Sequence, residues 1–230
     1  SVKNISNYRF ERKFRIFNLS KMEVETIVKS NKRIFSEIFY SRIVNNIYYD
    51  SLGFSSFYDN IDGNTERKKY RIRWYGKLFG EITNPTFEIK YKKGLLGYKD
   101  QYKLNSFIMD KHFSNKTIDH IIANSSIPKK IKFILKSLTP TLLNSYRRKY
   151  FQSLNKIYRI TIDDNQGFYP IKNINNSFLQ CFHDESVVLE LKYKTIYDEG
   201  SEKVTNEFPF RLTKNSKYVN GINKLYGLEF

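Results

Sequence analysis

The hexapeptide FEIKYK at residues 87–92 decides the fold, because it reads as one strand with two different faces. Side chains alternate between the faces of an extended strand, so its Glu and both Lys share one face while its Phe, Ile and Tyr share the other. For a single strand, the simplest interpretation is a half-buried sheet whose charged face meets water. What decides between that and a charged interior is whether other strands repeat the pattern.

Together with residues 87–92, five candidate strands carry charge on one face at the same two-residue spacing. The positions are Glu11 and Lys13, Glu88 and Lys90, Glu190 and Lys192, Arg71 and Arg73, and Arg159, Thr161 and Asp163. A solvated outer face normally mixes small polar residues with both signs of charge. The repetition of a few residue types therefore predicts a closed sheet whose apolar face packs outward and whose charged face lines an interior.

The remaining segments supply enough strands to close such a barrel. Alternation predicts strands at residues 8–17, 45–51, 68–76, 84–92, 96–104, 145–154, 156–164 and 186–194. Helical patterns predict a helix capped by Ser20 and Glu23, helical segments between about 110 and 145 with Pro128 at a first turn, and a closing helix that ends near Gly227. We therefore expect an α+β fold, an eight-stranded antiparallel β-barrel tunnel with helices packed outside.

Composition restricts the class of protein. The 230 residues suffice for one sizeable core, and no linker or repeat divides them, so we predict a single domain over residues 1–230. The formal net charge of +17 predicts an anionic partner. The lone Cys181 excludes an internal disulfide and is typical of a small buried residue. No apolar run reaches the ~18 residues of a membrane span, so we expect a cytoplasmic protein, with membrane association only through a partner. Nothing in the sequence indicates an oligomeric state.

A lumen crowded with cations needs an anion. Two like charges ~4 Å apart at an effective dielectric of ~20 repel by ~4 kcal/mol, whereas the net stability of a domain is ~5–15 kcal/mol. A chain of phosphates offers closely spaced oxygens that Arg binds in bidentate fashion and Lys meets as a point charge. A carboxylate beside those phosphates, Glu190 foremost, needs a divalent cation between, and oxygen ligands favour Mn²⁺ or Mg²⁺.

These segments, in their order along the chain, resemble the VTC-type polyphosphate polymerase domain. That domain is a branch of the triphosphate tunnel metalloenzymes, the CYTH-like superfamily. The stretches that carry the resemblance are FERKF, NIYYDS, KYRIRWYG, FEIKYK, LTPTLLNSYRRKYF, YRITIDD, VVLELKY and RLTKNSKYVNGI, which extend from about residue 8 to 226. The resemblance implies a metal-dependent enzyme that transfers the γ-phosphate of ATP, or of another triphosphate, to a growing polyphosphate chain.

The resemblance also implies roles for individual residues. The phosphate-binding bases at the catalytic centre would be Lys13, Arg71, Arg73, Lys90, Arg148 and Arg159. Further substrate contacts would come from Lys192, from Ser216 and Lys217 at the start of the last helix, and from either Lys99 or Lys103, which share a face. Glu190 would be the metal ligand. Free backbone N–H groups and the helix dipole favour an anion at such a helix start.

Two alternatives remain at this point. Many hydrolytic relatives carry Glu-x-Glu-x-Lys on the first strand, and Arg9 occupies the first acidic position here, which favours transfer over hydrolysis. Glu11, Glu88 and Asp163 nevertheless leave an inorganic triphosphatase as the second candidate. A non-catalytic module that binds polyphosphate or nucleic acid is the third, and nucleic acid is not expected because Tyr and Phe in strands are usually core residues. No catalytic role is expected for His112, His120 or His183.

Overall fold

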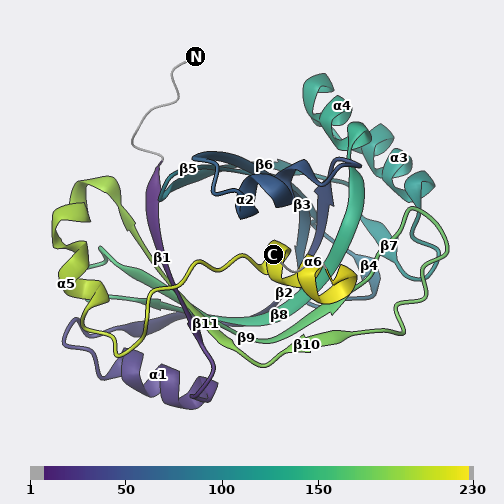
Figure 1. The fold of residues 1–230 in the computed structure, drawn as a ribbon. Coiled ribbons are helices and arrows are strands. Elements are labelled where there is room, and N and C mark those ends of the chain that lie inside the picture. Colours follow the sequence, from purple (N-terminus) through teal and green to yellow (C-terminus); the bar gives the residue numbers. More distant parts are fainter. Residues whose placement is uncertain (1–7, 228–230) are drawn as a thin grey trace.

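The computed structural model describes residues 8–227, and within them eight antiparallel strands close into a ring (Figure 1). Around the ring the strands follow the order β1 (Arg9–Ile16), β6 (Leu96–Lys103), β5 (Thr86–Lys93), β3 (Glu66–Tyr75), β2 (Ser36–Asp50), β8 (Thr139–Gln152), β9 (Arg159–Tyr169) and β11 (Val187–Lys194), which pairs with β1. β10 (Phe182–Asp184) adds to β9, and β4 (Gly80–Ile82) pairs with β7 (Phe107–Met109) in a small separate sheet. The predicted barrel is therefore confirmed.

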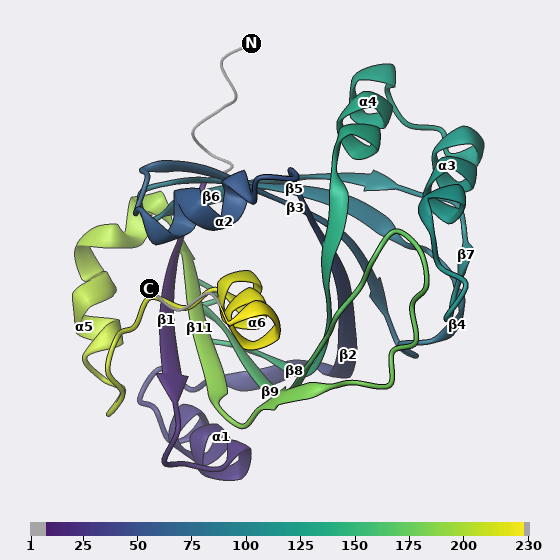
Figure 2. The ribbon, with the colours of Figure 1, turned by 45° about the vertical axis from the view of Figure 1, so that its right-hand side comes forward.

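Helices lie around the ring, and the last of them lies across its opening (Figures 1 and 2). They are α1 (Lys21–Lys29), α2 (Ser55–Ile61), α3 (Asn115–Asn124), α4 (Lys129–Ser137), the 3₁₀ turn η2 (Thr195–Gly200), α5 (Ser201–Thr205) and α6 (Lys217–Tyr226). The capping box of Ser20 and Glu23 begins α1 as predicted, with the Ser20 N–H donating to Glu23 Oε2 at 2.7 Å. None of the helices within residues 8–227 has the length and apolar character that a bilayer span requires.

The outward face of the ring is apolar. Phe14 on β1 and Leu189 on β11 are fully buried in a cluster with Val24 of α1. Ile72 on β3 and Phe87 on β5 are equally buried in a second cluster that includes residues of α3 and α4. Burial of this kind stabilises a fold by about 25 cal/mol per Å² of apolar surface. Because the apolar side of these strands packs outward against helices, their charged side faces the lumen.

Cross-strand register aligns the charged positions around the ring. Lys13 on β1 lies opposite Glu190 on β11, which lies opposite Thr161 on β9. On the other side, Arg71 on β3 lies opposite Glu88 on β5. Residues directly opposite each other share a face of the sheet, so each two-residue charge pattern meets that of its neighbour inside the ring.

Two element boundaries differ from the prediction. The strand predicted at residues 45–51 begins nine residues earlier, at Ser36. The helical region expected to extend to about residue 145 ends at Ser137, and β8 begins at Thr139. Pro128 is the N-cap of α4, one position before the helix. Cys181 was expected to be buried, and the structure corrects this, because its side chain is half-buried.

The helix α6 lies across the opening of the ring, within its outline in both views (Figures 1 and 2). Its residues Tyr218 and Ile222 pack against Leu142 on β8 and Phe168 on β9. Gly221 permits the close approach, because a Cβ there would overlap Leu142 and lie 2.7 Å from Phe168 Cδ1. The predicted stop is confirmed, since Gly227 caps the helix with φ of 62°.

Asp50, at the end of β2, joins two helices at this opening. It is fully buried and accepts from the backbone N–H groups of Ser56 and Phe57 in the first turn of α2, at 2.9 and 3.1 Å. It also accepts from the Tyr218 hydroxyl of α6 at 2.6 Å. The N-cap position of α2, Phe54, makes no side-chain cap, so Asp50 satisfies the helix start in its place.

Candidate active site

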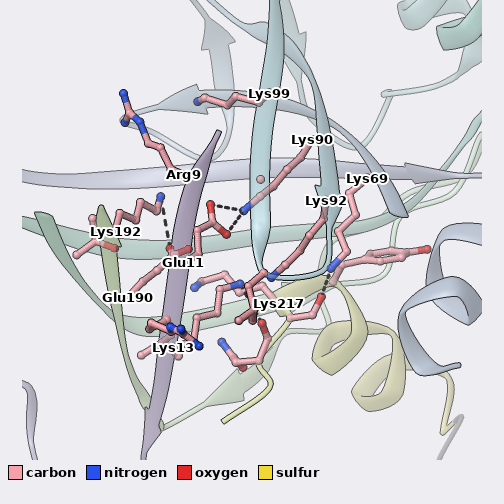
Figure 3. Close-up of a pocket in the computed structure, with 18 of the residues that line it drawn as sticks. Arg9, Glu11, Lys13, Lys69, Lys90, Lys92, Lys99, Glu190, Lys192 and Lys217 are labelled. Carbon is pink, nitrogen blue, oxygen red and sulfur yellow. Dashed lines mark hydrogen bonds and ion pairs between the residues drawn. The ribbon is translucent and has the colours of Figure 1, made fainter. Parts of the chain in front are cut away.

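A cavity of about 1540 Å³ lies inside the ring (Figure 3). Among the described residues that line it, fifteen are Lys or Arg and three are acidic. The cations are Arg9, Arg12, Lys13, Arg67, Lys69, Arg71, Arg73, Lys90, Lys92, Lys99, Arg148, Arg159, Lys192, Lys214 and Lys217. Such an excess of one sign in a closed space creates a strong positive potential, which favours a highly charged anion.

Glu88 balances part of this charge from beneath the cavity surface. It is fully buried and accepts from the Arg71 guanidinium, with Nε at 2.7 Å, and from Lys99 Nζ at 3.0 Å. Gln101 donates to the same carboxylate at 2.5 Å. Burial alone would raise the pKa of Glu88, but Arg71 and Arg73 hold it far below its usual range. Glu88 is thus a buried counter-ion that fixes the positions of Arg71 and Lys99 in the wall of the lumen.

Asp163 plays the same part on the opposite wall. It accepts from Arg148 Nε at 2.6 Å and from Lys217 Nζ at 2.6 Å, which joins β8, β9 and α6. Burial would raise the pKa of Asp163, but Arg148 and Lys217 lower it to about 2. Lys217 Nζ also lies 4.6 Å from the ring centroid of Tyr146. These contacts fix the start of α6 against Arg148 of the cavity lining.

The carboxylates that reach the cavity surface near its centre are Glu11 and Glu190. Lys90 Nζ donates to both oxygens of Glu11, at 2.9 and 2.7 Å (Figure 3). Burial would raise the pKa of Glu11, but Lys90 lowers it to about 2 although Glu190 opposes this. Glu190 Oε2 lies 3.6 Å from Lys192 Nζ, while its buried Oε1 has no hydrogen-bond partner. A buried, ionised oxygen without a protein partner is a position that water or a cation can occupy.

Lysines without a close carboxylate gather beside the start of α6. Lys69 Nζ donates to Ser216 Oγ, the N-cap of α6, at 2.6 Å, and Lys13 Nζ donates to the Asn215 carbonyl at 3.0 Å. Burial, with Lys13 and Lys90 nearby, lowers the pKa of Lys69 well below its usual range. Burial also lowers the pKa of Lys13 to about 7, although Glu190 opposes this. Neither lysine of this cluster has a carboxylate within hydrogen-bond distance in the described part of the chain.

The structure brings together all but one of the predicted site residues. Every one of them lines the cavity except Lys103, which is exposed near the end of β6. Lys99, the alternative to Lys103, lies in the cavity wall against Glu88. Arg159 and Lys192 lie opposite each other on β9 and β11. His112, His120 and His183 are exposed, as expected.

Sequence reasoning assigned no ligand-binding role to six of the fifteen cations that line the cavity, which are Arg9, Arg12, Arg67, Lys69, Lys92 and Lys214. Three of the six continue the charge pattern of strands already singled out. Lys69 and Arg67 precede Arg71 on β3 at two-residue steps, and Lys92 follows Lys90 on β5. The signal was present, because extending the same-face period by one or two steps along each strand reaches all three. Sequence reasoning also did not foresee that Glu88 and Asp163 neutralise neighbouring cations.

The donor set fits a divalent cation only in partnership with a ligand. No group of three or more His, Cys, Asp or Glu side chains within the described part of the chain could hold an ion alone. Mg²⁺ and similar ions are commonly held by one or two carboxylates together with phosphate oxygens and water. The unpartnered Glu190 Oε1, with Glu11 nearby, provides that number of carboxylates.

The closed antiparallel ring is a fold that solved structures share. A protein from Hippeastrum, named as a candidate adenylyl cyclase and described with a dominant triphosphatase activity, is 10% identical, with a TM-score of 0.52 over 91% of this chain and 93% of that chain. A candidate adenylate cyclase from Vibrio parahaemolyticus is 12% identical, with a TM-score of 0.51 over 93% of this chain and 97% of that chain.

The sequence itself matches the VTC domain over residues 8–226. The chain therefore belongs to the VTC domain family. A comparison with curated proteins finds no match.

Proposed function

We propose that this protein is a polyphosphate polymerase that transfers the γ-phosphate of ATP to the end of a polyphosphate chain inside the ring. The observation that carries the proposal is the cavity of about 1540 Å³ lined by fifteen cations. Small-molecule sites usually occupy about 300–1,000 Å³, so this lumen has room for a triphosphate together with further phosphate units. Membership of the VTC domain family supports the same assignment.

In the proposed reaction, a terminal oxygen of the polymer attacks the γ-phosphorus, and the bond from that phosphorus to the β–γ bridging oxygen breaks, so that ADP leaves. Phosphoryl transfer depends on positioning and on neutralising charge over the transferred group. The bidentate Arg side chains held by Glu88 and Asp163 would orient the phosphates, and the lysines beside α6 would neutralise the polymer. The reaction then needs no nucleophile from the protein.

A divalent cation, Mn²⁺ or Mg²⁺, would be held by Glu190 and phosphate oxygens, with Glu11 beside them. Bound there, it would neutralise charge on the transferred phosphate. Lys90 keeps Glu11 ionised, and Lys192 does the same for Glu190, so both carboxylates remain anionic at any physiological pH. Glu190, whose Oε1 has no hydrogen-bond partner, differs in this from Glu88 and Asp163, whose oxygens are already bound by Arg and Lys.

Triphosphate hydrolysis is the second candidate, and the activity described for the Hippeastrum protein of similar fold favours it. Against it, Arg9 lies on β1 where hydrolytic relatives carry an acid, and Glu11 is bound by Lys90 at 2.7 Å. Both features reduce the negative charge available to activate water.

Incubation with γ-labelled ATP and Mn²⁺, followed by sizing of the products, tests the proposal. A polymerase yields long labelled polymer and ADP, whereas a triphosphatase releases inorganic phosphate from tripolyphosphate. A module that only binds yields neither product. Release of phosphate without polymer would replace the proposed function with the second candidate.

Matched substitutions on one strand test the site. Arg148→Ala removes a cation of the lumen. Arg147→Ala removes the neighbouring arginine, which faces outward and donates to Asp164 at the surface. We expect at least a hundredfold loss of synthesis for Arg148→Ala, Arg71→Ala and Arg159→Ala, and less than a twofold change for Arg147→Ala. Circular dichroism shows whether each variant is folded. Wild-type turnover in folded Arg71→Ala and Arg159→Ala would contradict the assignment.

A further inference from the structure

Three aromatic side chains of the cavity lining gather around an arginine that is not itself part of the lining. This cluster is here called the aromatic collar and is defined as Phe39, Arg42, Tyr75 and Tyr150. The Arg42 guanidinium carbon lies 5.3 Å from the ring centroid of Phe39, 5.5 Å from that of Tyr75 and 5.6 Å from that of Tyr150. Phe39 and Tyr150 also meet edge to face at 5.7 Å. The three rings come from β2, β3 and β8, which are neighbours in the ring.

The collar does not serve the hydrophobic core. The Phe39 and Tyr75 side chains are 50% and 49% exposed, and neither belongs to a buried cluster. An aromatic side chain held half in water contributes little to stability and presents a free face. Exposed rings gathered around a guanidinium form a stacking surface, because both aromatic faces and the guanidinium plane stack on flat conjugated ligands.

The collar opens into the same cavity as the phosphate-facing cations. Phe39, Tyr75 and Tyr150 all line that cavity. Tyr75 follows the lumen residue Arg73 by two positions, and Tyr150 follows Arg148 by two positions, so each ring lies about 7 Å further along its strand. The order from the interior outward is therefore cation first and aromatic ring second, on two strands independently.

A ligand that matches this order has phosphates at one end and a flat conjugated ring at the other. Inorganic polyphosphate has no such ring, so binding of the polymer does not account for the collar. A nucleoside triphosphate has both parts, with a sugar between them that spans the step from Arg73 and Arg148 to the rim.

We propose that the aromatic collar binds the nucleobase of the triphosphate donor by stacking. This inference rests on the proposed function, because it assigns the donor a place at the Arg73 and Arg148 side of the lumen. Stacking on aromatic side chains tolerates different bases, since every base has a π-face. The collar thus distinguishes a nucleotide from a bare phosphate chain, and it supplies the binding contribution that tripolyphosphate lacks.

Calorimetric binding of two probes tests the collar without turnover. The probes are the β,γ-imido analogue of ATP, which carries a base, and inorganic tripolyphosphate, which does not. We expect Tyr75→Ala and Phe39→Ala to weaken binding of the ATP analogue about tenfold and to change tripolyphosphate affinity by less than about twofold. Tyr75→Phe, which keeps the ring, should bind the analogue like the wild type.

Tyr40→Ala is the matched control. Tyr40 adjoins Phe39 on β2, is 94% exposed and is not among the residues that line the cavity, so its loss should leave both affinities unchanged. Equal weakening of both probes in Tyr75→Ala, or no weakening of either, would overturn the proposal. A wild-type protein that bound the analogue no better than tripolyphosphate would overturn it too. A protein that shows the collar effect but makes no polymer would refute the proposed polymerase activity and leave the collar assignment intact.

Discussion

At the scale of single residues, buried acids determine which cations the lumen offers to a ligand. Glu88 binds Arg71 and Lys99, and Asp163 binds Arg148 and Lys217, so these four cations are already oriented before any phosphate arrives. Orientation in advance lowers the entropic cost of binding. Lys69 and Lys13 have no such acid within hydrogen-bond reach in the described structure, and burial lowers the pKa of both lysines.

Glu190→Gln tests the carboxylate whose buried oxygen lacks a partner. The amide keeps the shape but loses the charge that a divalent cation needs, so we expect binding of Mn²⁺ in the presence of tripolyphosphate to weaken at least about tenfold. Calorimetry measures this directly, and metal activation of synthesis should be lost in parallel. Glu185→Gln, an exposed acid five residues away, is the control. Unchanged metal affinity in Glu190→Gln would remove its role as ligand.

Lys69 predicts a proton uptake on ligand binding. Burial lowers the pKa of Lys69 well below 10.5, so in the free protein the amine loses its proton at a pH where an exposed lysine keeps it. A phosphate beside Lys69 favours the ammonium form and raises that pKa again, so protons are taken up between the lowered value and 10.5. Tripolyphosphate titrations at a series of pH values below 10.5, in buffers of different ionisation enthalpy, measure the uptake.

Lys69→Arg separates charge from titration, because guanidinium stays protonated throughout this pH range. The variant should still bind tripolyphosphate but take up fewer protons than the wild type. An uptake equal to that of the wild type would assign the proton to another group. In the unliganded protein the lowered pKa of Lys69 also makes stability depend on pH. Between the lowered value and 10.5 the unfolded chain binds more protons than the folded protein, so the free energy of unfolding rises with pH.

At the scale of elements, sequence periodicity located the strands whose two faces differ and failed where they do not. β5 and β11 alternate cleanly, because one face meets the lumen and the other meets helices. At the start of β8, Leu142 packs on α6 while its neighbour Leu143 packs in the outer cluster, so both faces are apolar and the run resembles a helix. The first half of β2 is largely exposed on both faces and therefore has no period to detect.

Gly221→Ala tests how α6 is seated. The added methyl group would overlap Leu142 and approach Phe168, and overpacking of this kind costs about 1–3 kcal/mol. We expect a lower melting temperature together with weaker tripolyphosphate binding, because Ser216 and Lys217 move with the helix. Gly53→Ala is the control, since nothing lies within 4 Å of a Cβ at that position. A variant with wild-type stability and binding would show that close seating of α6 is not required.

At the scale of the whole molecule, the barrel is reversed in polarity, with apolar side chains outside and charges within. This arrangement could be predicted from the sequence, because charge repeated on one face of five strands has no place on an ordinary surface. The aromatic collar could not, since Phe39 lies in the part of β2 without periodicity and bulges shift its register against β8. Nor could the exclusion of Lys103 from the cavity, which depends on where β6 leaves the ring.

The uncompensated lumen predicts that anions stabilise the folded protein. Tripolyphosphate at about 100 times its dissociation constant should add about 2.7 kcal/mol, which corresponds to several degrees of melting temperature. Thermal denaturation with and without the anion measures this, and sodium chloride at equal ionic strength is the control. A melting temperature that tripolyphosphate leaves unchanged would mean that the lumen does not take up phosphates.

Asp50 links the two helices at the opening of the ring through a single carboxylate. Its carboxylate binds the start of α2 and the Tyr218 hydroxyl of α6, and Tyr218 follows directly on Ser216 and Lys217 at the ligand-facing end of that helix. We therefore expect an anion bound at the start of α6 to affect α2 through Tyr218 and Asp50. The two helices should become less ordered together when the lumen is empty and more ordered together when it is filled.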